Sequence, residues 1–152
     1  MTSATSVRFD LGAGTNYATG PGTYVSSTLL GGAAADKLIV GGATTGYIDA
    51  GAGADSLVFN GVVAGASTTT MATILGGTGA DTLDFNASVK YATILGGTDS
   101  ANDIDFASTV DEVTVRGGTG IDTLGVTGKY TSSLFAGGEG ADDASEGKPT
   151  KL

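Results

Sequence analysis

The sequence predicts an all-β fold, a parallel β-solenoid of about seven coils with about 20 residues in each. Three observations carry this prediction. A Gly-Gly motif recurs along the chain at one phase, an acidic or amide residue follows it at a constant distance, and columns of apolar residues keep the same phase. A unit of this length cannot bury its own apolar face, whereas stacked units bury the faces of their neighbours.

The repeat is aligned on the first position of each Gly-Gly motif. The steps between successive copies are 20, 19, 26, 20, 21 and 20 residues. The long step contains the Ser/Thr-rich stretch 64–70, which predicts a surface loop. The aligned positions are Leu11, Gly31, Ala50, Gly76, Gly96, Gly117 and Gly137. The acidic slot that follows them holds Asn16, Asp36, Asp55, Asp81, Asn102, Asp122 and Asp142.

Apolar residues occupy two positions that keep this phase. One column, two residues before the motif, consists of Phe9, Leu29, Ile48, Ile74, Ile94, Val115 and Phe135. The other, two residues after the acidic slot, consists of Ala18, Leu38, Leu57, Leu83, Ile104, Leu124 and Ala144. Two residues further on come Val40, Phe59, Phe85, Phe106 and Val126, and a weaker column holds Val63, Val89, Val110 and Tyr130. Spacing by two predicts strands, with Leu83 and Phe85 facing the core and Thr82 and Asp84 facing outward.

One solenoid domain is predicted over residues 1–146, with a polar tail over 147–152. Its coils are expected near 7–25, 26–45, 46–70, 71–90, 91–111, 112–131 and 132–146. The first and last coils are atypical, as capping repeats are: the first contains Pro21 and Tyr24, and the last places Ala144 and Glu146 at inward positions. The alternative fold is an antiparallel sandwich, which predicts alternating turn types and no single recurring phase.

The composition excludes several classes of protein. A hydrophobic share of 40% and a charged share of 15% are typical of an ordered chain despite 27 glycines. A net charge of −9 with seven Lys and Arg argues against binding to nucleic acid and to anionic membranes. No segment approaches the roughly 18 apolar residues of a membrane span, so membrane insertion is not expected. The first residues lack the pattern of a cleavable signal peptide.

Two segments match the pattern G-G-x-G-x-D-x-U-x, in which U is a large apolar residue: 76–84 and 117–125. Segment 50–58 misses one glycine, and 137–145 has alanine at the apolar position. The chain thereby resembles the RTX nonapeptide family, the calcium-binding β-rolls of secreted bacterial proteins. The resemblance implies Ca²⁺ held between equivalent corner loops of adjacent coils. Its carboxylate ligands would be Asp36, Asp55, Asp81, Asp122 and Asp142, and Gly76, Thr78, Gly117 and Thr119 would offer backbone carbonyls.

Stacking also brings like carboxylates to a spacing of roughly 5 Å, where each pair repels by about 1 kcal/mol in water. A hard divalent cation would reverse that sign. The chain departs from the family in having a unit of about 20 residues, with the motif at one edge only and Asn at positions 16 and 102. The alternative is that each Asp after a glycine turn caps backbone amides without an ion.

The absence of His and Cys removes the common nucleophile–base pairs, so no enzyme is expected. The best outward carboxylate pair for a glycan-active site is Asp84 with Asp105, and a solvated strand face is the simpler interpretation. Ice binding by the column of Thr28, Thr73, Thr93 and Thr114 is disfavoured because Tyr47 and Leu134 interrupt it. The expected function is a non-enzymatic structural rod that self-associates or joins a larger assembly on a virion surface, as a phage decoration or fibre protein. The alternative is a secreted, RTX-like calcium-binding module of a bacterial surface layer or adhesin, located outside the cell.

Overall fold

A computed structural model describes residues 3–146 of the chain, and within that range it contains strands and no helix. No helix that could cross a membrane therefore occurs in the described part of the chain. The strands are β1 Ala4–Thr5, β2 Arg8–Asp10, β3 Tyr17–Val25, β4 Thr28–Ala33, β5 Lys37–Thr44, β6 Tyr47–Ala52, β7 Ser56–Phe59, β8 Val63–Ala64, β9 Ala72–Thr78, β10 Thr82–Phe85, β11 Val89–Thr98, β12 Asp103–Phe106, β13 Val110–Thr119, β14 Thr123–Val126, β15 Tyr130–Thr131, β16 Leu134–Glu139 and β17 Asp143–Glu146. The predicted tail at 147–152 lies outside the described residues.

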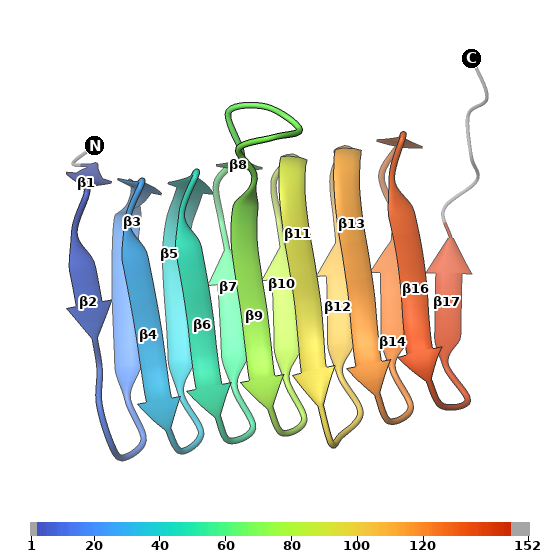
Figure 1. Cartoon of the computed structure of the whole chain (residues 1–152), viewed down its shortest axis with the longest axis horizontal. Coiled ribbons are helices and arrows are strands. Elements are labelled where there is room, and N and C mark those ends of the chain that lie inside the picture. The colour runs from blue at the N-terminus through green and yellow to red at the C-terminus, as the bar shows by residue number, and fades with distance from the viewer. Residues whose placement is uncertain (1–2, 147–152) are drawn as a thin grey trace.

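The strands wind into a flattened rod with two sheets (Figure 1). The front sheet consists of β2, β4, β6, β9, β11, β13 and β16, and the back sheet consists of β3, β5, β7, β10, β12, β14 and β17. Every pairing between these strands is parallel and joins one coil to the next, as in Ile48↔Ile74↔Ile94↔Val115. The predicted β-solenoid of about seven turns is thereby confirmed, and the antiparallel sandwich is wrong.

The predicted apolar columns form one continuous core between the two sheets from Leu29 to Val126, with Phe135 packed against its end. Phe9 was predicted to belong to this core but is 40% exposed, because it lies on the first coil and is covered from one side only. The side chains of Ala144 and Glu146, predicted to face inward, lie outside the described residues. Leu83 and Phe85 are buried, while Thr82 and Asp84 are half-buried on the outer side, as the spacing by two predicts. Three phenyl rings stack face to face along the rod: Phe59 on Phe85 and Phe85 on Phe106, each with ring centroids 4.8 Å apart. Each coil therefore covers the apolar side chains of the next, which no single coil could do alone.

The Ser/Thr-rich stretch 64–70 is a loop at the upper corner, as predicted (Figure 1). Ser67 and Thr70 form a short antiparallel bridge at its tip. The register resumes directly after it, because Tyr47 pairs with Thr73 and Ile48 with Ile74. The 26-residue step is thus absorbed outside the rod without shifting the repeat.

The Gly-Gly motifs form the lower corner, where the chain passes from the front sheet to the back sheet. Gly77 has φ = +111°, a conformation that side chains with a Cβ rarely adopt. A Cβ built there would lie 1.9 Å from the backbone carbonyl oxygen of Gly51 on the preceding coil. Glycine is required at this position both by its backbone conformation and by the close stacking of the corners.

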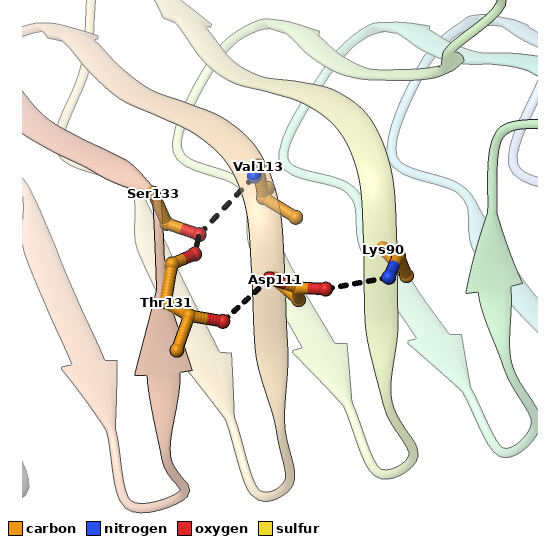
Figure 2. Close-up of polar contacts among 5 residues, drawn as sticks. All are labelled: Lys90, Asp111, Val113, Thr131 and Ser133. Atoms are coloured by element: carbon orange, nitrogen blue, oxygen red, sulfur yellow. Dashed lines mark hydrogen bonds and ion pairs between the residues drawn. The ribbon is translucent and has the colours of Figure 1, made fainter. Parts of the chain in front are cut away.

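The opposite, upper corner carries a polar network between the last coils (Figure 2). Lys90 and Asp111 are register partners, and Lys90 Nζ lies 2.7 Å from Asp111 Oδ2. The Thr131 hydroxyl donates to Asp111, and Ser133 accepts a hydrogen bond from the Val113 amide at 3.1 Å. The hydrogen bond from Lys90 and then that from Thr131 lower the pKa of Asp111. Since the ion pair is partly exposed to solvent, it aligns the corner more than it stabilises the fold.

Candidate functional site

The acidic slot forms a single buried column that runs along the lower corner of the rod. Its central members are all less than 4% exposed: Asp36, Asp55, Asp81, Asn102 and Asp122. Each lies just before a strand of the back sheet, with its side chain buried in the wall, by which we mean the packed backbone of the lower corner. The column is the largest buried polar feature among the described residues, and we treat it as the candidate site.

One oxygen of each side chain binds the coil before it. The Oδ1 atom of each slot residue accepts a hydrogen bond from the backbone N–H of the slot residue one coil earlier. The N···O distances are 2.7 Å for Asn16 to Asp36, 2.7 Å for Asp36 to Asp55, 2.9 Å for Asp55 to Asp81, 3.1 Å for Asp81 to Asn102, 2.8 Å for Asn102 to Asp122 and 3.0 Å for Asp122 to Asp142. The predicted capping of backbone amides is confirmed, but it joins neighbouring coils and is not local to one turn.

The second oxygen of each buried carboxyl group has no such partner. Within the described part of the chain, the Oδ2 atoms of Asp36, Asp55, Asp81 and Asp122 are buried without a hydrogen bond. Asp81 Oδ2 packs over Gly76, since a Cβ built on Gly76 would lie 2.6 Å from this oxygen. The same point lies 2.2 Å from the carbonyl oxygen of Gly96 on the next coil. Two oxygens therefore flank one small volume that only a glycine leaves open.

Asn102 shows how the same position works with an amide. Its Nδ2 donates to the carbonyl oxygens of Gly117 at 3.3 Å and Ser100 at 3.2 Å, and to Asp122 Oδ1 at 3.0 Å. A Cβ built on Gly96 would lie 3.0 Å from this Nδ2 and 2.4 Å from the Gly117 oxygen. The arrangement matches that of Asp81, with a donor in place of the unpartnered oxygen.

Burial changes the acidity of the central carboxyl groups. Burial in the wall raises the pKa of Asp81 to about 6, against the lowering effect of the hydrogen bond from the Asp55 amide, and the charge of Asp55 adds to the rise. The pKa of Asp55 is also raised, first by burial and then by the charges of Asp36 and Asp49, while the hydrogen bond from the Asp36 amide opposes the rise. Both shifts favour the neutral acid in the folded chain.

The carboxylates that the RTX resemblance names lie in this column, and the named backbone carbonyls belong to the glycine corners at the ends of β9 and β13. Calcium takes six to eight oxygens around one point, whereas the described residues contain no group of three or more acidic side chains that could hold a metal ion. Two of the named backbone carbonyls are already hydrogen-bonded, since Gly117 accepts from Asn102 and Thr78 accepts from the Gly53 amide. A calcium ion here would therefore need most of its oxygens from backbone carbonyls, and the predicted ligand set stays a prediction. Whether the chain binds calcium elsewhere or in solution stays a prediction.

Removing calcium tests that prediction directly. Because each of these carboxyl groups is buried and binds a backbone amide through Oδ1, we expect the melting temperature to be the same in a strong chelator and in millimolar calcium. Thermal unfolding followed by circular dichroism at pH 7.5 measures the difference. A fall of the melting temperature by tens of degrees in chelator would instead support the calcium sites that the resemblance implies.

A second acidic group lies outside the wall on the back sheet. Asp84 and Asp105 are register partners on β10 and β12, at a depression that Asn86 and Thr127 also line. Partial burial, and then the charges of Asp103 and Asp84, raise the pKa of Asp105. This is the pair that the sequence singled out as the best place for glycan chemistry, and the structure brings it together on an open strand face.

Searches against protein-family models, curated proteins and solved structures found no match to this chain. The likeness to RTX repeats thus rests on the two full motifs alone.

Proposed function

We propose that this chain is a non-enzymatic structural protein, a stiff repeat rod that packs against further copies of itself through its front sheet. The assembly we favour is an outer layer of a virion, in which the rod serves as a decoration or fibre protein. A bacterial surface layer is the second context, and it would use the same sheet in the same way.

The difference between the two outer faces is the observation that supports this proposal. In the central coils, the front sheet presents two register-paired rows, Thr73–Thr93 and Leu75–Leu95, all half-buried and uncharged. On the same coils, the back sheet presents the carboxylates of Asp84, Asp103 and Asp105. Asp49 and Arg116 flank the Leu75–Leu95 row on the adjacent coils. The uncharged stretch between them suits contact with a like surface, whereas the acidic face repels other copies and stays in solvent.

The front sheet also carries larger exposed apolar side chains on other coils. Tyr47 is 39% exposed and Leu134 is 51% exposed, and both lie in the same column as Thr73 and Thr93. They interrupt the threonine row that ice binding would use, but they extend an apolar contact along the rod. The front sheet therefore supports assembly better than it supports an ordered water layer.

Adding charge to the front sheet tests the proposal. We expect the wild-type chain to form higher assemblies in sedimentation velocity, and the double variant L75D/L95D to remain monomeric while its circular dichroism and melting curve stay those of a folded rod. The matched control is Val58→Asp, which adds a carboxylate to the half-buried outer side of the back sheet. A monomeric wild-type chain at all concentrations, or an equal effect of the control, would contradict the proposal. Labelling of purified particles and of cell surfaces in electron micrographs then separates the two contexts.

A further inference from the structure

The two ends of the rod are complementary in hydrogen bonding, packing and charge. We propose that rods in the assembly also join head to tail, with the last coil of one copy stacked on the first coil of the next as a further turn of the same solenoid. The inference deepens the proposed function and rests on it in one respect. An end contact is one coil wide and weak alone, so the front sheets are needed to hold the rods in line.

Both ends of the rod present strand edges that have no partner among the described residues. At the first coil, β2 pairs only with β4, and the first half of β3 pairs only with β5. At the last coil, β16 pairs only with β13, and β17 pairs only with β14. The residues that make the first coil atypical, Pro21 and Tyr24, lie in the second half of β3, where β1 pairs with Tyr24 and Val25. The remaining edges are templates for the parallel pairing that joins the coils.

The buried column ends in an unpaired acceptor on the first coil and an unpaired donor on the last. Asn16 is the first slot residue, so within residues 3–146 its Oδ1 has no earlier coil to bind. Its Nδ2 donates to the carbonyl oxygen two residues before it, as the Nδ2 of Asn102 does, so the two amides have the same orientation. The backbone N–H of Asp142 lacks the acceptor that a next coil would supply. Stacked ends join these groups by the bond that the Asp81 amide donates to Asn102 Oδ1 inside the rod, at 3.1 Å.

The packing surfaces of the two ends also fit each other. At Gly138 a Cβ would lie 1.9 Å from the carbonyl oxygen of Gly118, so the last corner is closed by the coil before it. Gly12 holds the same position in the first coil, with φ = +77°, and a Cβ built there meets nothing within 4 Å. The Gly138 oxygen of another copy can therefore take that space. In the same register Phe135 covers Phe9, which is 40% exposed in the single chain.

The charges of the two ends do not oppose the contact. In the continued register Glu139 meets Ala13 and Asp143 meets Tyr17, and none of the described carboxylates of one end meets a carboxylate of the other. Lys37 follows Tyr17 in the column that Asp143 joins, two ladder spacings or roughly 10 Å away. The acidic last coil therefore faces a coil with a positive charge behind it. Because the two contact surfaces differ, the stacking does not close and continues as a filament.

Disulfide trapping tests the junction, since the chain has no cysteine of its own. In A13C/E139C the two thiols lie at opposite ends of one rod, and head-to-tail stacking brings thiols of two copies to a Cα spacing of about 5 Å, which a disulfide can bridge. We expect mild oxidation of the assembled protein to give a ladder of covalent multimers on a non-reducing gel. The single variants A13C and E139C should stay monomeric, because this contact does not pair a residue with itself. Disulfide dimers of either single variant, without a ladder in the double variant, would overturn the proposal.

Two further variants separate the end contact from the front-sheet contact. A13E places a carboxylate opposite Glu139 of the next copy. We expect assembly in sedimentation to persist, while filaments with an axial repeat of about 34 Å per copy are lost from electron micrographs. Adding E139K to A13E should restore the filaments. Wild-type assemblies without the A13C/E139C ladder would overturn the end contact alone. A ladder that persists in the L75D/L95D background would support the end contact and contradict the front-sheet packing.

Discussion

Replacing Gly77 by alanine is expected to destabilise the rod by about 3–5 kcal/mol. The new Cβ would require a residue with a side chain to adopt φ = +111°, and it would lie 1.9 Å from the carbonyl oxygen of Gly51. That oxygen belongs to the backbone of the preceding coil, which is held by the pairing of β6 with β9. Relief would require the two corners to separate, and the hydrogen bonds of both sheets resist that movement.

Gly46→Ala is the matched control, because it makes the same change at the opposite corner. The nearest atom to a Cβ built there is the Ser27 carbonyl oxygen at 3.4 Å, and its φ is not in the left-handed range. We expect the free energy of unfolding of this variant to lie within about 1 kcal/mol of the wild-type value. Chemical denaturation of both variants gives the comparison. Equal losses of unfolding free energy would show that the stacking of the lower corner is not what constrains Gly77.

Replacing Phe85 by alanine is expected to cost about 3–5 kcal/mol of unfolding free energy. The ring is 1% exposed and lies between Phe59 and Phe106, with interplanar angles of 2° and 8°. Its removal leaves a void at the middle of the stack and breaks two ring contacts, each worth about 0.5–1.5 kcal/mol beyond the buried area. The parallel strands on either side are fixed by their register, so the void cannot collapse easily.

Phe85→Leu and Thr82→Ala complete this test. Leucine retains most of the apolar contact and should cost well under half of the alanine effect. Thr82 faces outward on the same strand, and its truncation should change the unfolding free energy by no more than about 0.5 kcal/mol. Denaturant titrations under identical conditions measure all three. If Phe85→Ala costs no more than Thr82→Ala, the phenyl stack does not contribute to the core as proposed.

Most of the fold could be predicted because its signal is repeated. The spacing of the Gly-Gly motifs determines which residues are stacked, and the columns through Ile74 and Leu83 follow from that phase alone. The loop at 64–70 could be predicted because its composition breaks the pattern while the phase resumes after it. A single copy of the unit would not have distinguished a strand of a solenoid from a hairpin.

The orientation of the acidic slot could not be predicted in the same way. Spacing shows that Asp55 and Asp81 are stacked, but it does not show whether their carboxyl groups face the solvent side of the corner or its wall. The signal that could have indicated the wall is the presence of Asn16 and Asn102 in the same column. Asn102 accepts an amide hydrogen bond through Oδ1 as the aspartates do, so the position requires an acceptor that faces the preceding coil.

The loop between β8 and β9 leaves the rod at one corner and returns without disturbing the coils on either side. Thr68 and Thr69 at its tip are exposed, and lengthening such a connection costs little chain entropy. A foreign peptide grafted between these two threonines would project from one fixed position along the rod. If the scaffold assembles in a regular layer, the graft would recur there as an ordered antigen array.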